Sequence, residues 1–448
     1  MTALAGLGAV IVALSWGGLA LHVPGAVSVG SPRLTNVFVA LLVLAGVVYL
    51  VAVRQVLRRP PGGRRAILLV ALVAAAMRLP LVPVQPFLSS DVYRYVWDGR
   101  VQDAWINPYR YIPAAPQLKT LRDRAIYPHV NRRTYARTIY PPAAEMVFAG
   151  VGLLGRSVIA MKLAMLAFEA AGMACALLLL RRAGLPRARL LIYAWNPLAA
   201  WSFAGNGHVD AIAVGLVGLA LLARADARRG WAGAALGAAT LTKFLPVAIG
   251  PALWRPWDWR LPAAFLAVIV LLYLPYLGAG AHVLGFLPHY ASQEDITSGP
   301  GIWLLAGIDE VVPVGREAAL IYLTLAALAL LCLGFWLALR PRPSDAAADV
   351  QRICGDAAIL GACTIAAMSP HYPWYFVWLA LPACVQPYRA VVWLSAAPLI
   401  LYLDPWNEQF FWRALVYVPM IALAVLDVRQ RRRALAPRLE LAAQRSPR

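Results

Sequence analysis

Long apolar segments separated by polar connections run through almost the whole chain. A helix needs about 20 mainly apolar residues to cross a bilayer, and about 12 segments meet or approach that length. They are residues 3–22, 36–53, 66–84, 157–180, 190–204, 209–223, 261–278, 317–339, 353–369, 374–386, 389–403 and 411–427. The pattern predicts an all-α, polytopic transmembrane bundle, in which the shorter and proline-broken segments pack inside.

One apolar segment, residues 231–253, does not fit this pattern. It consists of two halves around Leu241-Thr242-Lys243, and each half is too short to cross a membrane. Arginines flank it on both sides, among them Arg229 and Arg255. We therefore expect a re-entrant or half-crossing hairpin that begins and ends in the cytoplasm.

Basic residues gather in alternate connections and indicate the topology. The clusters are Arg54, Arg58, Arg59, Arg64 and Arg65; Arg181, Arg182, Arg187 and Arg189; Arg340 and Arg342; and Arg429, Arg431, Arg432 and Arg433. Positive charge marks the cytoplasmic side, so both termini are expected there. The extracytoplasmic side then receives the connections 85–155, 204–208, 279–315, 370–373 and 404–410. Residues 1–427 are interpreted as one membrane domain, and residues 428–448 as a basic cytoplasmic tail.

Composition supports the membrane interpretation. Of 448 residues, 61% are hydrophobic and 14% are charged, which excludes an ordinary soluble or disordered chain. The net charge of +20 resides largely in the connections and the tail, so we attribute it to topology and anionic headgroups and expect no nucleic-acid partner. The five cysteines show no metal-ligand spacing. The apolar N-terminus, which lacks a cleavage site, is expected to be a retained first helix.

The connection 85–155 combines aromatic, basic and acidic residues, as functional loops do. Asp91 follows an apolar segment by only a few residues, where an acid is costly unless it is paired or lies in a wet cavity. The alternatives are an ion pair with Arg94 or a helix cap, and Asp98 has the alternative of pairing with Arg94 on one helix face. The apolar stretch Pro142–Leu154 predicts a helix at the outer interface.

Three other places supply polar groups near the same face. Asp210 follows Asn206-Gly207-His208-Val209 at an expected helix start, where capping is the alternative to a functional role. Lys243, in the hairpin, needs a lipid phosphate or a carboxylate to compensate its charge, unless it snorkels to the cytoplasm. His371 lies in the turn Ser369-Pro370-His371-Tyr372-Pro373-Trp374-Tyr375, where it offers a hydrogen-bond donor to an anion, although a plain aromatic turn is the alternative.

An outward cavity with an acid, a lysine, a histidine and arginines suits one class of chemistry. Cations at the membrane surface bind an amphiphilic phosphate, and a nearby acid can take the proton of an incoming hydroxyl. These groups together indicate transfer of a group from a lipid-phosphate donor to an alcohol, with the phosphate leaving as a stabilised anion. The residues alone do not identify the group that is transferred.

A family resemblance extends this interpretation. The motifs Ser90-Asp91-Val92-Tyr93-Arg94-Tyr95, Trp97-Asp98-Gly99-Arg100, Asn107-Pro108-Tyr109 and Ile139-Tyr140-Pro141-Pro142 resemble the first outer loop of bacterial polyprenyl-phosphate-mannose-dependent mannosyltransferases. These are C-type glycosyltransferases, similar to glycosyltransferase family 87. Asn196-Pro197, Gly207-His208-Val209-Asp210, Leu241-Thr242-Lys243 and Ser369-Pro370-His371-Tyr372 resemble the group in order and spacing, so the likeness covers roughly residues 66 to 386.

The resemblance implies a role for each motif. Asp91 matches the acid that activates the acceptor hydroxyl in an inverting, single displacement that gives an alpha product. Lys243 and His371, with Arg94 and Arg100 as secondary candidates, would hold the donor phosphate. The residues expected to contact substrate are Tyr93, Asp98, Asn107, Tyr140, His208 and Asp210.

One position departs from the pattern of the relatives. Many of them carry two adjacent acids at the start of the loop, whereas this chain has Ser90 before Asp91. We therefore predict no cofactor, no metal site and metal-independent activity. The expected partners are a polyprenyl-phosphate-sugar donor, a glycan or glycolipid acceptor and the lipid bilayer. The expected location is the bacterial inner membrane, with the active site outside and a role in building envelope glycans.

Three alternatives remain open at this point. A transporter or flippase of lipid-linked sugars would also have broken helices and an intramembrane lysine. A related C-type enzyme could use another polyprenyl-phosphosugar, such as one of glucose or arabinose. A non-catalytic subunit of an envelope-building complex is the third.

Overall fold

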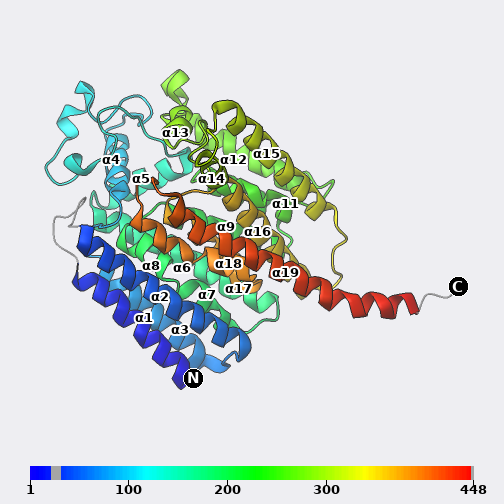
Figure 1. Cartoon of the computed structure of the whole chain (residues 1–448). Helices are drawn as coiled ribbons and strands as arrows, with labels where there is room; N and C mark the ends of the chain where they lie inside the picture. The colour runs from blue at the N-terminus through cyan, green and yellow to red at the C-terminus, as the bar shows by residue number, and fades with distance from the viewer. Residues whose placement is uncertain (22–31, 445–448) are drawn as a thin grey trace.

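The structure is a computed structural model that describes residues 1–21 and 32–444. Every regular element in these ranges is helical, and no strand occurs there (Figure 1). The first half contains α1 (Thr2–Ala20), α2 (Pro32–Arg58), α3 (Gly63–Arg78), η1 (Leu79–Leu81), α4 (Asp91–Asp103), η2 (Pro116–Leu121), η3 (Tyr127–His129), α5 (Pro142–Leu154), α6 (Val158–Arg182), η4 (Arg187–Leu190), α7 (Leu191–Ala194), α8 (Pro197–Ala200), η5 (Trp201–Gly205) and α9 (Asp210–Ala225). The all-α class predicted from the sequence is confirmed.

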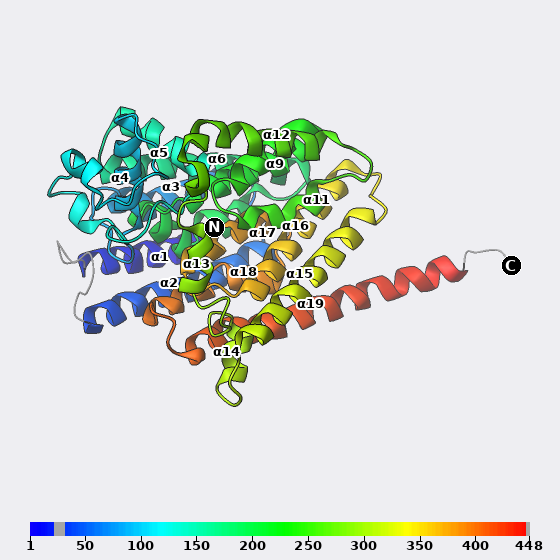
Figure 2. The ribbon, with the colours of Figure 1, turned by 90° about the horizontal axis from the view of Figure 1, so that it is seen from above.

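The second half continues the helical pattern. It contains α10 (Arg229–Thr240), η6 (Leu245–Ile249), α11 (Gly250–Leu253), α12 (Arg260–Tyr273), η7 (Leu274–His282), α13 (Leu287–Gln293), α14 (Trp303–Asp309), α15 (Arg316–Leu339), α16 (Ala346–Met368), η8 (Pro373–Leu379), α17 (Ala380–Val385), α18 (Arg389–Leu394), η9 (Ala397–Leu403) and α19 (Phe410–Gln444). Seen from above, the helices pack side by side as one bundle (Figure 2).

Seven helices in the described ranges are long and apolar enough to cross a membrane, rather than the predicted 12. They are Thr2–Ala20, Thr35–Arg58, Val158–Arg182, Arg260–His282, Arg316–Leu339, Ala346–Met368 and Phe410–Gln430. The other predicted segments form shorter or broken helices. Residues 190–204, for example, divide among η4, α7, α8 and η5, since Pro197 interrupts the backbone hydrogen bonds of a continuous helix.

The broken helices lie in the core, as the sequence predicts. Every residue of α7, α8 and η5 is buried, so these pieces are surrounded by protein on all sides. Asn196 helps to satisfy the interrupted backbone, because its side chain accepts a hydrogen bond from Ala199 N and donates one to Ser395 O at 2.7 Å. Buried polar backbone at a helix break requires such partners.

The segment predicted as a hairpin reverses direction after α10. Helix α10 packs against both η6 and α12, and an ion pair between Arg229 and Asp258 ties the start of α10 to the chain that follows α11. At the turn, the carbonyl of Leu241 accepts hydrogen bonds from the amides of Ala143 and Ala144, at 3.0 and 3.4 Å. The turn that carries Lys243 is therefore attached to the start of α5, in the long connection 85–155.

Helix α19 passes through the predicted boundary at residue 427 without a break. It extends as one helix from Phe410 to Gln444 and projects from the bundle (Figure 1). The tail expected from residue 428 onward thus begins as a continuation of the last apolar helix.

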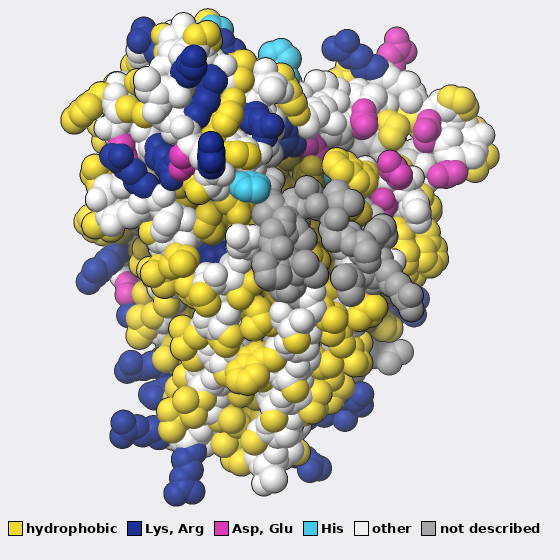
Figure 3. All heavy atoms as spheres, turned by 90° about the vertical axis from the view of Figure 1, so that its left-hand side faces the viewer, with side chains coloured by type: hydrophobic (Ala, Val, Ile, Leu, Met, Phe, Trp, Pro, Cys, Tyr) yellow, Lys and Arg dark blue, Asp and Glu magenta, His cyan; other side chains and the backbone are white. Residues whose placement is uncertain are grey.

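The face of the molecule shown in Figure 3 is divided from top to bottom by side-chain type. Figure 3 shows hydrophobic side chains over the helical body, lysines and arginines around its lower margin, and mixed charges in the upper part. An apolar band between two charged zones is the surface expected of a protein in a bilayer.

A buried ion pair ties α3 to α6. Arg78 donates from Nε and Nη2 to the two carboxylate oxygens of Glu169, at 2.8 and 2.7 Å, and from Nη1 to the carbonyl of Ala194 at 2.7 Å. The Glu169 side chain is completely buried, so loss of Arg78 would leave an uncompensated charge inside the bundle.

We therefore expect Arg78→Met to destabilise the protein by about 3–5 kcal/mol. Thermal unfolding of the detergent-purified protein should show this as a lower transition temperature. The double variant Arg78→Met/Glu169→Gln should recover part of the loss, since it removes the unpaired charge. An unchanged transition in Arg78→Met would contradict the assigned importance of this pair.

Candidate active site

A cavity of about 740 Å³ lies where surface connections of the bundle meet. Its wall comes from the segment before α4, residues 132–141, the turn 242–245, α13 with the loop after it, residues 368–375 and residues 402–406. These segments include parts of four connections predicted to share one side, namely 85–155, 279–315, 370–373 and 404–410. These four connections therefore meet at one cavity, and their placement on the extracytoplasmic side stays a prediction.

Asp91, the first residue of α4, forms part of the cavity wall with a side chain that is 20% exposed. Asn131 donates a hydrogen bond to its Oδ1 at 2.6 Å, and Nδ1 of His208 lies 3.7 Å from its Oδ2. Burial raises the pKa of Asp91, although the positive charges of Arg132 and Lys243 oppose the rise. Neither sequence alternative is realised, because Arg94 pairs elsewhere and α4 has no side-chain cap.

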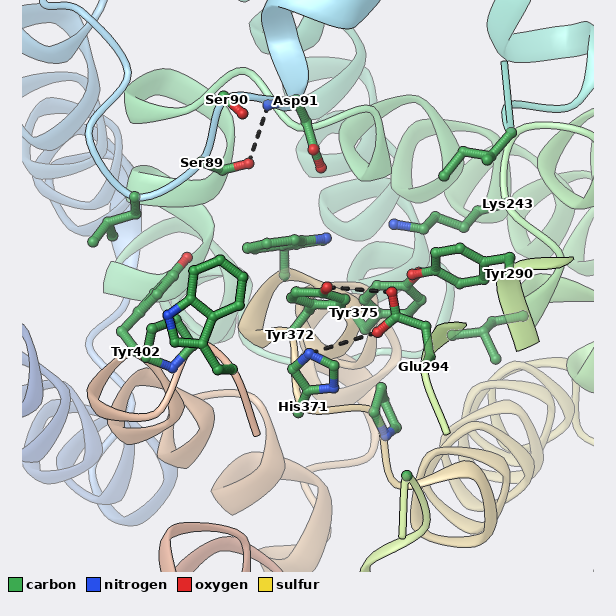
Figure 4. A pocket seen from close by; sticks show the side chains of 18 of the residues that line it. Ser89, Ser90, Asp91, Lys243, Tyr290, Glu294, His371, Tyr372, Tyr375 and Tyr402 are labelled. Carbon is green, nitrogen blue, oxygen red and sulfur yellow. Dashed lines mark hydrogen bonds and ion pairs between the residues drawn. The ribbon is translucent and has the colours of Figure 1, made fainter. Parts of the chain in front are cut away.

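Lys243 lines the same cavity, with its amine directed toward the space below Asp91 (Figure 4). Its Nζ donates to Oδ2 of Asp210 at 2.9 Å and lies 3.8 Å from the centre of the Tyr375 ring. A carboxylate therefore compensates the lysine, and the alternative of snorkelling to the cytoplasm is wrong. Asp210 does not line the cavity and makes no capping hydrogen bond at the start of α9, so its capping alternative is also wrong.

His371 lines the cavity beside an acid that the sequence analysis did not identify. Nε2 of His371 lies 3.7 Å from Oε2 of Glu294. Burial and the charge of Arg413 lower the pKa of His371 to about 4. The imidazole is therefore neutral near pH 7, and it can donate a hydrogen bond to an anion but adds no positive charge.

Arg132 supplies a cation at this wall. Its Nη2 lies 3.3 Å from Oε1 of Glu294, and the hydroxyl of Tyr372 donates to the same oxygen at 3.3 Å. Figure 4 shows Glu294, Tyr372 and His371 grouped together, opposite Asp91. Burial raises the pKa of Glu294, and Arg132 opposes that rise.

Seven predicted site residues lie outside the cavity lining, and five of them belong to the connection 85–155, which corrects their expected placement. Arg94 is paired with Asp98 at 2.9 Å, and both side chains are buried. Arg100 pairs with Asp123 at 2.5 Å. Tyr93 packs on His129, with ring centres 4.8 Å apart, and Asn107 donates to the carbonyl of Tyr276 at 3.0 Å. These contacts hold the five side chains within the folded connection 85–155 or against Tyr276, and not in the cavity wall.

Of the other two predicted residues, Tyr140 lies in the cavity wall and His208 lies behind it. His208 is fully buried behind the wall, where its ring stacks on Trp374 at 3.9 Å. Asp91, Lys243, His371 and Tyr140 thus share one cavity, while His208 and Asp210 contact cavity residues from behind.

Sequence analysis missed Arg132, Glu294 and the ring of Trp374 as parts of the wall. Glu294 and its neighbours form an acidic stretch, Gln293-Glu294-Asp295, within a connection predicted to face outward. An acid in such a connection was the available signal. Among the side chains that the structure describes, no group of three or more His, Cys, Asp or Glu residues is placed to hold a metal ion. Metal independence stays a prediction.

The fold and the cavity define a class. In the part of the chain that the structure describes, seven apolar helices of spanning length indicate a membrane protein, and the cavity of mixed charge has the size of a small-molecule site. More particularly, residues 1–257 match the N-terminal domain of the MptA_B family, described as alpha-(1->6)-mannopyranosyltransferase. The match covers more than half of the 448 residues, so the chain belongs to this family and is a glycosyltransferase of the mannosyltransferase type.

This membership confirms the resemblance inferred from the sequence motifs. Comparison with curated proteins and with solved structures gives no further match. The matched range contains Asp91, Arg132 and Lys243 and ends before Glu294 and His371.

Proposed function

We propose that the protein transfers mannose from a polyprenyl-phosphate donor to an acceptor hydroxyl at the outer face of the bacterial inner membrane, with inversion at the sugar carbon. One observation carries this proposal: the carboxylate of Asp91 and the amine of Lys243 project into a single cavity (Figure 4). A base and a cation around one space suit the attack of a hydroxyl on a phosphate-linked sugar.

The proposed step is a single displacement. Asp91 accepts the proton of the acceptor hydroxyl as its oxygen bonds to the anomeric carbon. The bond from that carbon to the phosphate oxygen breaks, and its electron pair stays on the phosphate. Lys243 and Arg132 stabilise the departing anion, while neutral His371 can add a hydrogen bond. Because the nucleophile enters opposite the leaving group, the anomeric configuration inverts.

The arrangement of the connections supports the proposed sidedness. Four of the connections around the cavity are predicted to lie outside because the intervening connections carry the arginine clusters. In this orientation a lipid-linked donor would place its chain among the apolar helices and its head in the cavity.

Purified protein in liposomes, supplied with radiolabelled polyprenyl-phosphate mannose and a mixed pool of membrane acceptors, tests the function directly. We expect labelled product, and we expect EDTA to leave its rate unchanged because Ser90 replaces a second acid beside Asp91. Activity that EDTA removes and a divalent ion restores would contradict metal independence. Transfer from another polyprenyl-phosphosugar, or donor movement without a new glycosidic bond, would favour the alternative enzyme or the flippase.

The acid side of the pH profile should report Asp91. Burial raises its pKa above the ordinary value of 3.8, and only the ionised carboxylate can accept the acceptor proton. Activity should therefore be present above the raised pKa of Asp91 and be lost as the pH falls through it. This loss should occur at a higher pH than it would for an aspartate with an ordinary pKa. The measurement is kcat/KM against pH.

The matched control for this profile is His371→Gln. Because the pKa of His371 is lowered to about 4, the ring stays neutral over most of the pH range. Its removal should therefore not shift the pH at which activity is lost on the acid side of the profile. A limb that disappears in His371→Gln would assign the titration to the histidine instead.

A further inference from the structure

The cavity has a second carboxylate, that of Glu294, and a row of stacked aromatic rings connects it to Asp91. The ring of His208 lies 3.9 Å from that of Trp374, Trp374 lies 4.9 Å from Tyr372, and Tyr372 lies 3.9 Å from His371. His208 meets Asp91 at one end, and His371 meets Glu294 at the other, each at 3.7 Å. Trp374, Tyr372 and His371 line the cavity, so its wall is a ring surface with an acid at each end.

Glu294 is held in place but is not tightly bonded. Its contacts with Arg132 and Tyr372 are both 3.3 Å, and its contact with His371 is 3.7 Å. Hydrogen bonds that involve a charged group are usually about 2.5–2.9 Å long. The two oxygens of a carboxylate accept about four hydrogen bonds. Glu294 also has a hydrogen bond with Tyr290. A ligand hydroxyl in the cavity would therefore replace one of the long contacts of Glu294 with a shorter hydrogen bond.

The chemistry of this wall selects a neutral ligand with several hydroxyl groups. A carboxylate accepts strong hydrogen bonds from hydroxyl groups and repels an anion. The stacked rings of Tyr372 and Trp374 border the cavity and give this part of its wall an apolar surface. A pyranose ring combines hydroxyl donors at its edge with an apolar C–H face, and so it matches both parts of the wall.

We infer that Glu294, Tyr372 and Trp374 form a subsite for an uncharged pyranose ring. The inference rests on the proposed function, which supplies two candidate sugars for this subsite. One is the mannose of the donor, and the other is a sugar of the acceptor. Glu294 also engages Arg132, so that it restrains a cation that the departing phosphate can use.

This arrangement gives Glu294→Gln two effects of opposite sign. The affinity for methyl mannoside or a mannose disaccharide should fall roughly ten- to hundredfold, since a hydrogen bond to a charged group is lost. The affinity for polyprenyl phosphate, measured as its inhibition constant, should rise several-fold because Arg132 is released. A purely structural role for Glu294 would weaken both ligands together, and that result would overturn the subsite.

A second variant and a control keep the test independent of folding. Tyr372→Phe keeps the ring and removes the hydroxyl that donates to Glu294, so sugar affinity should fall a few-fold with phosphate affinity unchanged. Glu310→Gln, an exposed acid in the same connection, should change neither. Wild-type protein that binds no saccharide, or unchanged saccharide affinity in Glu294→Gln, would overturn the inference.

Two activity measurements distinguish the sources of the sugar. If the subsite holds the acceptor, Glu294→Gln raises the KM for acceptor and leaves donor hydrolysis by water unchanged. If it holds the donor's mannose, hydrolysis and transfer fall together and the KM for donor rises. Saccharide binding without transfer in the wild type would support the subsite while contradicting the proposed function. Transfer that proceeds in the wild type and is unchanged in Glu294→Gln would support the proposed function and contradict the subsite.

Discussion

Replacement of Asp91 with asparagine is expected to lower the rate of transfer by about 10²–10⁴-fold, the usual contribution of a general base. The amide has nearly the same shape and can still contact Asn131, which now donates to Oδ1 at 2.6 Å. It has no negative charge with which to accept the acceptor proton. Donor affinity should therefore change little, and the loss should appear in kcat, measured with radiolabelled polyprenyl-phosphate mannose.

The control for Asp91→Asn is Asp103→Asn on the same helix. Asp103 pairs with Arg156 at 2.9 Å, outside the cavity lining, and its amide should leave transfer intact. Undiminished transfer in Asp91→Asn would mean that another group is the base. Asp98 would then be a poor substitute, because it is buried against Arg94 and does not line the cavity.

Loss of the charge at Lys243 is expected to have two separable consequences. In Lys243→Gln the donor phosphate loses a charged hydrogen-bond donor, so donor affinity should fall roughly ten- to hundredfold. Asp210, whose side chain is 6% exposed, also loses its partner at 2.9 Å. Breaking a buried ion pair from one side costs about 3–5 kcal/mol, so the variant should also unfold at a lower temperature.

The double variant Lys243→Gln/Asp210→Asn separates these effects. It removes the unpaired carboxylate, so stability should largely return while donor affinity stays low. Asp210→Asn alone keeps the ammonium group 3.8 Å from the Tyr375 ring and should retain donor binding. If the double variant regained full donor affinity, the role of Lys243 would be structural and the phosphate would need another cation.

The predicted site residues that share one cavity lie on different connections, which the fold brings to one face of the bundle. Asp91, Lys243 and His371 are far apart in the chain, and they meet because the connections that carry them lie at one face. Sequence neighbours of Asp91 were a weaker guide. In a helix of about 3.6 residues per turn, Tyr93 and Arg100 point away from the side on which Asp91 lies. Arg94 instead meets Asp98 four residues later, as the alternative interpretation had it.

Glu294 shows why the rest was missed. Its partners Arg132 and Tyr372 are 162 and 78 residues away in the chain, so no local spacing indicates the cluster. The predicted count of about 12 spanning helices is not confirmed, for a related reason. Hydropathy detects apolar segments, but it does not distinguish one spanning helix from two short pieces separated by a buried break such as Asn196-Pro197.

The cavity is assembled from both halves of the chain, and this has a consequence for divergence among relatives. Asp91, Arg132 and Lys243 lie within the residues that match the family, whereas Glu294, His371 and Tyr372 lie beyond residue 257. The base and the two cations proposed for bond breaking thus lie on the first stretch of polypeptide, whereas His371 and the groups proposed for sugar recognition lie on the second. A chimera joined near residue 257 would exchange the residues of one stretch with those of a relative while keeping the residues of the other stretch. Saccharide preference can therefore change among relatives while the reaction chemistry is retained.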